Sequence, residues 1–157
     1  VFYDKKQKCF FDDAEHTHSA LHSNVLPLYF GFAPPQAFEN IKNIIMKKGF
    51  ACGVQFSYFV LKALGKIGAY KEEFELLTNE SEHSWVNMLR EGATTCFEAW
   101  GKDQKWNTSL CHAWASAPII ALAEDILKVD FDDERPSVYT KSFTIDNKQY
   151  KAELKLK

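Results

Sequence analysis

The chain of 157 residues has no excess of positive charge and no long hydrophobic run. Its 19 lysine and arginine residues are balanced by 21 aspartate and glutamate residues, which gives a formal net charge of -2. A protein that follows the phosphate backbone carries a basic patch, so we expect no nucleic-acid partner. No apolar run reaches membrane-spanning length, so we expect no membrane partner. No signal peptide is visible, and because the chain begins at Val1 without a methionine we expect it to be part of a longer protein.

Closely spaced cysteines are also missing. The four that occur, Cys9, Cys52, Cys96 and Cys111, form no Cys-x-x-Cys motif, which argues against a zinc knuckle. Because 46% of the residues are hydrophobic, the chain can build a core without a disulfide framework. We therefore interpret the cysteines as mostly small buried residues, with a disulfide between Cys96 and Cys111 as an alternative.

A recognisable metal-binding pattern is missing as well, although three histidines lie close together. His16, His18 and His22 are not all spaced by four residues, and no acidic residue completes a familiar zinc pattern. We predict neither a metal nor a cofactor. His22 and Asn24 are expected instead to face a polar pocket.

The pattern that is present is helical. Apolar residues recur at intervals of three and four, and prolines and glycines stand where helices begin and end. The sequence predicts helices over residues 19–30, 35–48, 54–64 and 116–128, a shorter helix marked by Tyr70, Phe74 and Leu77, and another that contains Trp85 and stops at Gly92. The helix over 54–64 is apolar on nearly all sides, whereas the helices before and after it have one polar face. We expect pairs of helices joined by short loops, within one mainly α domain over residues 1–129.

Several finer expectations follow from the same pattern. We expect Glu72, Glu73 and Glu75 to lie on the outside of their helix, and Asn79 or Ser81 to cap the next one. Apolar stripes are expected to bury Trp85, Met88 and Leu89 in one helix, and Ala115, Ile119, Leu122 and Ile126 in another.

The two ends of the chain differ from this helical part. Residues 1–15 are compatible with either a helix end or a small hairpin. Residues 130–136 form a charged linker, and the following segments alternate with a period of two around Asp146-Asn147, which predicts a β-hairpin. We assign residues 130–157 to a linker and β tail, with the start of a larger β-sheet domain as an alternative.

The stretch from Trp85 to Pro118 contains all four tryptophans and an isolated acid, Glu98, between Phe97 and Trp100. A buried carboxylate must be paired, hydrogen-bonded or neutralised, so an acid among aromatic rings is costly in a plain core. Polar, ring-shaped ligands such as sugars make use of this combination. Trp85 is expected in the core and Trp106 at the rim of a site.

The motif Gly92-Ala-Thr-Thr-Cys-Phe-Glu98-Ala-Trp100, followed by Ser109-Leu-Cys-His112-Ala-Trp114-Ala-Ser-Ala-Pro118, resembles the catalytic domain of α-L-rhamnosidases in its C-terminal half. These enzymes are inverting glycoside hydrolases with a six-hairpin (α/α)6 barrel. The resemblance covers about residues 10–129, and it departs from the family pattern at Phe97, where a tryptophan is usual. It implies a mainly α fold, a partial (α/α)6 barrel with a short C-terminal β-hairpin.

The resemblance also implies roles for individual residues. Glu98 is expected to be the general base that activates water, and His112 is expected to bind sugar hydroxyls. Trp100 and Trp114 would form aromatic walls, with Thr95 beside them. His22 and Asn24 are expected at the rim of the pocket.

The general acid of this family comes from a more N-terminal hairpin, and the sequence contains no counterpart. Glu80 and Glu82 are interpreted as loop or cap residues, and Asp12 and Asp13 lie in a different context. We therefore expect about half a barrel, whose other half comes from the same parent chain or another chain, and no activity from this chain alone. The expected ligand is a rhamnose-containing glycan or glycoside. The compartment is not determined by the sequence, and the resemblance makes secretion or a periplasmic location the expectation.

Two other functions remain open at this point. One is a six-hairpin glycosidase that acts on a different sugar, such as a glucoamylase-like enzyme or a glucuronyl hydrolase. The other is a non-catalytic carbohydrate-binding or scaffold module that has kept the barrel and lost the acid.

Overall fold

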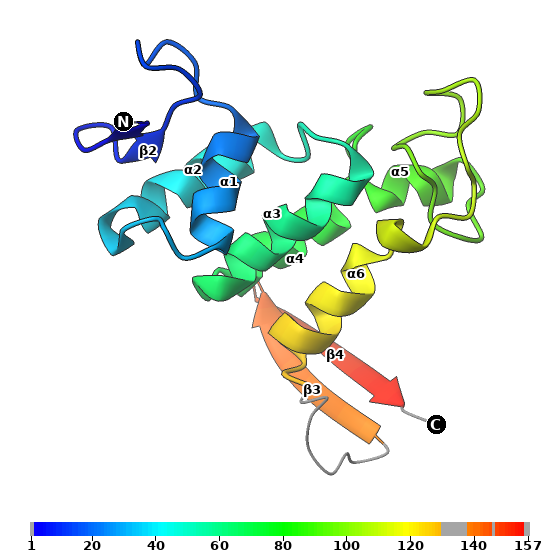
Figure 1. Cartoon of the computed structure of the whole chain (residues 1–157). Coiled ribbons are helices and arrows are strands. Elements are labelled where there is room, and N and C mark those ends of the chain that lie inside the picture. Colours follow the sequence, from blue (N-terminus) through cyan, green and yellow to red (C-terminus); the bar gives the residue numbers. More distant parts are fainter. Residues whose placement is uncertain (1, 130–137, 146, 156–157) are drawn as a thin grey trace.

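The structure, a computed structural model, describes residues 2–129, 138–145 and 147–155. The described residues include six α-helices (Figure 1), and no helix among them is long and apolar enough to cross a membrane. The prediction of a mainly α chain with a C-terminal β-hairpin is confirmed. The proposed linker, residues 130–136, lies outside the described residues, so the boundary after residue 129 stays a prediction. The helices and short helical turns are α1 (Leu21–Tyr29), η1 (Pro35–Ala37), α2 (Phe38–Lys48), α3 (Val54–Lys66), α4 (Tyr70–Thr78), α5 (Trp85–Arg90), η2 (Ala113–Ala115), α6 (Ala117–Ile120) and η3 (Ala121–Ile126).

Helix α3 is at the centre of the packing. It contacts α1, α4, α6 and η3, and these neighbours surround it in Figure 1. Its side chains Val60, Leu61 and Leu64 have no exposed surface. The apolar character of α3 on nearly all sides predicted this position, because a helix without a polar face must be covered by its neighbours.

The N-terminal segment forms a small hairpin of β1 (Tyr3–Asp4) and β2 (Cys9–Phe10), which decides between the two alternatives for residues 1–15. Asn24 of α1 attaches this hairpin to the helices. Its side-chain oxygen accepts from the amide of Phe10 at 2.9 Å, and its side-chain nitrogen donates to the Phe10 carbonyl at 3.1 Å. Asn24 has no exposed surface. The expectation that it faces a polar pocket is therefore wrong, because the hairpin backbone takes up its hydrogen bonds.

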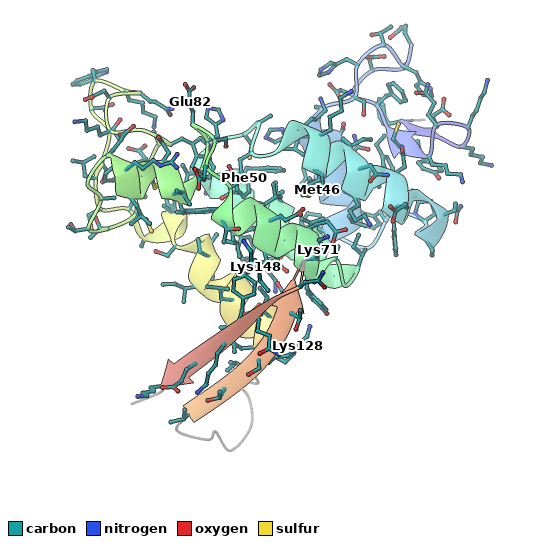
Figure 2. The ribbon with its side chains drawn as sticks, turned by 180° about the vertical axis from the view of Figure 1, so that it is seen from behind. Met46, Phe50, Lys71, Glu82, Lys128 and Lys148 are labelled. Carbon is teal, nitrogen blue, oxygen red and sulfur yellow. The ribbon has the colours of Figure 1, made fainter. Side chains whose placement is uncertain are left out.

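The C-terminal hairpin pairs β3 (Val138–Ile145) with β4 (Lys148–Lys155) in antiparallel register, as predicted. Asn147 in the turn has φ 62°, a conformation that asparagine tolerates better than most residues. The hairpin meets α4 through Phe74 and Tyr150, whose ring centroids lie 4.9 Å apart. Figure 2 labels Lys71 of α4 and Lys148 of β4 in the region where the helix and the hairpin approach each other.

Two local predictions about α5 are wrong. Its cap is Ser84, not Asn79 or Ser81, and the Ser84 hydroxyl accepts from the Asn87 amide at 3.0 Å. Leu89 is 67% exposed, whereas Trp85 and Met88 are buried. Since α5 has only six residues, it presents little more than one pair of side chains to the core.

The expected stripe of the last helix is also wrong in part. Residues Ala121–Ile126 form a π-helix, which has more residues per turn than an α-helix. The wider turn shifts the buried positions, so that Asp125 lies inside while Ile119, in the preceding α6, is 66% exposed. Ala115 and Ile126 are buried as expected.

The cysteines are all free thiols, and Cys9 is the buried one among them. Cys52 and Cys96 are partly exposed and Cys111 is exposed, so the interpretation as mostly buried residues is wrong. Cys96 and Cys111 do lie on neighbouring segments, because the amide of His112 donates to the Cys96 carbonyl at 2.9 Å.

A buried group of charged side chains joins α3, α4 and η3. Lys62 donates to both carboxylate oxygens of Asp125, at 2.8 and 2.7 Å, and lies 2.8 Å from Glu124. The Asp125 carboxylate lies directly over Gly65, where a Cβ atom would be 2.5 Å from its carboxyl carbon. Only glycine leaves room at that position of α3.

Glu73 of α4 belongs to the same group, and the prediction that it lies outside is wrong. It has no exposed surface, and its two carboxyl oxygens have no hydrogen-bond partner among the described residues. Burial, followed by the neighbouring charge of Asp125, raises the pKa of Glu73 to about 9. The folded chain therefore holds Glu73 protonated at neutral pH.

Replacing this carboxyl group is expected to change how stability depends on pH. Between the ordinary pKa of glutamate, 4.5, and about 9, the folded state binds a proton that the unfolded state has released. The free energy of unfolding therefore falls as pH rises through this window, by up to about 1.4 kcal/mol per pH unit. Glu73→Gln should flatten this dependence and stabilise the chain at pH 8, as measured by urea unfolding at pH 5 and pH 8.

The matched control is Glu75→Gln, an exposed residue on the same helix, which should leave the slope unchanged. A Glu73→Gln variant that loses stability between pH 5 and pH 8 as steeply as the unmodified chain contradicts the prediction.

Candidate active site

The candidate site is built on loops at one end of the helices. A cavity of about 710 Å³ lies between the N-terminal end of α3 and the long segment that connects α5 to α6. Glu98, Trp100 and Trp114 line it together with Gln55 and His83. Three of the seven sequence-predicted site residues therefore meet in one cavity.

Hydrogen bonds between two backbone segments hold Glu98 in place. The Glu98 amide donates to the Ser109 carbonyl at 2.8 Å, and the His112 amide donates to the Cys96 carbonyl at 2.9 Å. Residues 101–108 form the loop between these segments, and the Glu91 carboxylate accepts from the Lys102 amide at 2.6 Å near its start. The two halves of the sequence motif thus lie side by side.

The Glu98 carboxylate is bound at both oxygens and is still partly exposed. Lys105 Nζ lies 2.7 Å from Oε1, and the Ser109 amide donates to Oε2 at 3.2 Å. These contacts, that of Lys105 first, lower the pKa of Glu98 below its ordinary value, and the charge of His112 acts in the same direction. Glu98 is therefore ionised at neutral pH, the state that a general base requires.

Trp100 forms the base of the cavity. Its ring is only 2% exposed, stacks on Phe50 with centroids 5.2 Å apart, and donates from Nε1 to the Cys52 carbonyl at 2.7 Å. Little of its face is open to a ligand in this chain. Trp114 is 37% exposed and is the more accessible ring.

His112 and Thr95 lie near the cavity but do not line it. The His112 ring packs against Trp114, with centroids 4.3 Å apart, and so fixes one side of that wall. Thr95 is exposed, and its hydroxyl donates to the Leu110 carbonyl. Their roles in sugar binding stay predictions.

His22 lies elsewhere. Its ring packs against Phe56 at a tilt of 36°, with centroids 4.0 Å apart, and it lines a different cavity of about 580 Å³, together with residues of the N-terminal hairpin. The structure thus separates His22 and the buried Asn24 from the cavity that contains Glu98.

Sequence reasoning missed His83, Gln104 and Lys105. His83 is exposed, and its Nδ1 lies 2.9 Å from the Phe50 carbonyl oxygen. Gln104 accepts from the Trp100 amide at 3.1 Å, and Lys105 binds Glu98. Their position in the sequence could have indicated them. His83 lies two residues before the stretch from Trp85 to Pro118, and Gln104 and Lys105 lie in the polar loop within that stretch. Trp106 beside them is 97% exposed but does not line the cavity, so its place at the rim stays a prediction.

A second carboxylate is missing from this cavity. Among the described residues that line it, Glu98 is the one acid. The described residues also contain no group of three or more histidine, cysteine, aspartate or glutamate side chains that could hold a metal. The chemistry that the cavity offers is therefore that of an ionised carboxylate beside aromatic rings and a histidine.

Comparison with known proteins gives one family. The model of the bacterial alpha-L-rhamnosidase 6 hairpin glycosidase domain matches residues 4–126. No curated protein matches the chain. No solved structure matches it either.

Removing the cation beside Glu98 is expected to raise the pKa of this carboxyl group. In Lys105→Met the contact that lowers it most is lost, so the pKa should move back toward the ordinary value. A carbon-13 NMR titration of the glutamate carboxyl groups measures the shift. Lys102→Met is the control, because Lys102 is within ion-pair distance only of Asp103 among the described residues, at 4.0 Å. An unchanged Glu98 titration in Lys105→Met contradicts the prediction.

Proposed function

Because the chain belongs to the family of bacterial alpha-L-rhamnosidase six-hairpin glycosidase domains, we propose that it is part of an inverting glycoside hydrolase that cleaves terminal α-L-rhamnosides. Glu98 is the general base of this proposal. The observation that supports it most is the ionised Glu98 carboxylate in a cavity that also contains Trp100 and Trp114.

Inverting hydrolysis divides the work between two carboxyl groups. One protonates the leaving group, and the other removes a proton from the attacking water on the opposite face of the sugar. The two carboxyl groups lie about 6.5–9.5 Å apart, which leaves room for the water. The contacts of Lys105 and Ser109 keep Glu98 ionised, so it has no proton to donate as the acid. Glu98 would therefore accept the proton of the water as that water attacks the anomeric carbon.

The aromatic side chains suit the proposed sugar. Rhamnose has a methyl group where most hexoses have a hydroxymethyl group, so an apolar wall binds it well. The exposed part of Trp114 supplies this wall, and His112 packs against its ring and would bind a hydroxyl.

The general acid would come from the other half of the barrel. Glu98 is the one acid among the described residues lining its cavity, which supports an active site completed from outside this chain. Around a neighbouring groove of about 380 Å³, the side chains of Ile119 and Ile120 are exposed. Further helices packed there would cover this apolar surface.

One observation favours the second candidate, a non-catalytic carbohydrate-binding module. Lys105 occupies Glu98 Oε1 at 2.7 Å, and such a contact competes with a water molecule for the same oxygen. Replacing Glu98 distinguishes the two candidates, because turnover depends on Glu98 in the hydrolase and a non-catalytic module has no turnover to lose.

In the protein that contains both halves of the barrel, Glu98→Gln is expected to lower kcat by about 10²–10⁴-fold, the usual contribution of a general base. The assay follows release of the aryl group from an aryl α-L-rhamnoside. Proton NMR of the first product should show the β anomer of rhamnose. The control is Glu39→Gln, an exposed residue of α2 that does not line the cavity. Full activity of Glu98→Gln, or an α product, rejects the proposed role.

The chain of 157 residues by itself should not hydrolyse an aryl α-L-rhamnoside, because among the described residues no acid besides Glu98 lines the cavity to protonate the leaving group. The measurement compares release of the aryl group by the purified chain and by buffer. Clear turnover by the chain would show that the acid lies within it.

A further inference from the structure

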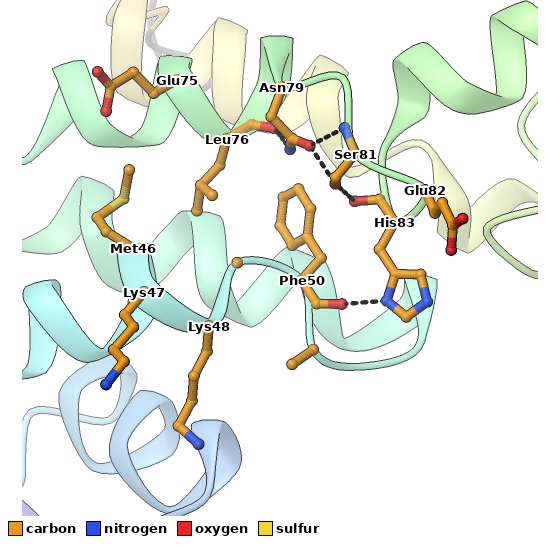
Figure 3. Close-up of a pocket in the computed structure, with 12 residues that line it drawn as sticks. Met46, Lys47, Lys48, Phe50, Glu75, Leu76, Asn79, Ser81, Glu82 and His83 are labelled. Carbon is orange, nitrogen blue, oxygen red and sulfur yellow. Dashed lines mark hydrogen bonds between the residues drawn. The ribbon is translucent and has the colours of Figure 1, made fainter.

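A second cavity adjoins the one that contains Glu98. It has a volume of about 680 Å³ and lies between the C-terminal end of α2 and the segment that follows α4 (Figure 3). Ala51 and His83 line both cavities. Each volume falls in the range of small-ligand sites, so a ligand of two sugar units could extend from one cavity past His83 into the other.

The second cavity has an apolar centre and a polar rim. Phe50 and Leu76 face each other beneath its middle but are only 2% and 5% exposed, so the partly exposed Met46 beside them supplies the accessible apolar surface (Figure 3). Sugar rings present C–H faces to such surfaces and hydroxyl groups to the polar rim. The combination fits a sugar unit better than a flat aromatic group.

The charges around the cavity balance. Lys47 and Lys48 are matched by Glu75 and Glu82, and within the described part of the chain none of the four forms an ion pair. The two lysine side chains point away from Phe50 and Leu76 (Figure 3). A charged ligand would gain little here, so the cavity favours a neutral one.

The rim is held in shape by its own hydrogen bonds. The side-chain oxygen of Asn79 accepts from the amide of Ser81 at 3.0 Å, and the Asn79 side-chain nitrogen donates to the Leu76 carbonyl at 2.5 Å. The segment after α4 therefore needs little ordering when a ligand binds, which favours binding.

His83 has a fixed ring and a free nitrogen. Because a carbonyl oxygen can only accept, the 2.9 Å contact with Phe50 places the proton of the neutral ring on Nδ1. Nε2 is then an acceptor, and it has no hydrogen-bond partner among the described residues. The ring is nearly parallel to Trp100, at 15° with centroids 6.1 Å apart. His83 can accept a hydrogen bond from a sugar hydroxyl at the junction of the two cavities.

We propose that the second cavity binds a neutral sugar unit on the leaving-group side of the cleaved bond, and that His83 binds a hydroxyl of that ligand at the junction. This rests on the proposed function. In an inverting enzyme the base and the leaving group lie on opposite faces of the anomeric carbon. The leaving group must therefore lie away from Glu98 in the same cleft, and Glu98 does not line the second cavity.

The test uses the nitrogen-15-labelled full chain and three probes. These are L-rhamnose, rutinose, a neutral disaccharide of L-rhamnose and glucose, and maltose, a neutral disaccharide of glucose alone. L-rhamnose and rutinose should both shift amide signals around Glu98. Rutinose alone should also shift those of Phe50, Leu76 and Asn79, which line the second cavity and not the one that contains Glu98. His83→Ala should weaken rutinose binding about fivefold, the effect of one hydrogen bond.

His83→Phe is the second variant, because it keeps a ring beside Trp100 but has no ring nitrogen. It should weaken rutinose binding as much as His83→Ala does. His18→Ala is the control, an exposed histidine that lines neither cavity. If L-rhamnose binds near Glu98 and rutinose shifts no signal of the second cavity, the second site is rejected and the proposed function stands. If maltose occupies both cavities more tightly than rutinose, the second site stands and the rhamnoside substrate is rejected. A folded chain that responds to none of the three probes rejects both.

Discussion

The burial of α3 on nearly every side is the constraint on which the rest of the structure depends. Its side chains fill the space between α1, α4 and the last helical segment. Its N-terminal end forms part of the Glu98 cavity, and the Cys52 carbonyl just before it accepts from Trp100. Helix packing thus fixes the base of the cavity, and the loops that carry Glu98 are attached to this base.

Two glutamates show how the fold assigns different properties to the same side chain. Glu73 is enclosed by helices and faces Asp125, so its pKa is raised and it has no access to a ligand. Glu98 is partly exposed and bound by Lys105 and an amide, so its pKa is lowered. A strongly perturbed acid is therefore not by itself a sign of catalysis. Access to a cavity separates the two.

The helices could be predicted well because their signals are local. The spacing of apolar residues, Pro35 in the first turn before α2, and Gly92 with φ 86° after α5 each act within a few residues. The motif around Glu98 also identified the region of the site. Asn24 could not be assigned in this way, because the hairpin that binds it lies 14 residues earlier. The environment of Glu73 could not be predicted either. It includes Asp125, which a π-helix about fifty residues later turns inward.

The sequence by itself therefore determined the helical class and the C-terminal hairpin, and its motif singled out Glu98 as the candidate base, since each follows from neighbouring residues or a continuous motif. The tertiary structure decided which predicted residues share one cavity. It brought Trp100 and Trp114 to Glu98, left His22 and Asn24 elsewhere, and added His83 and Lys105. The physical reason is that a cavity is formed by segments distant in the chain, whose distances are set by packing around α3.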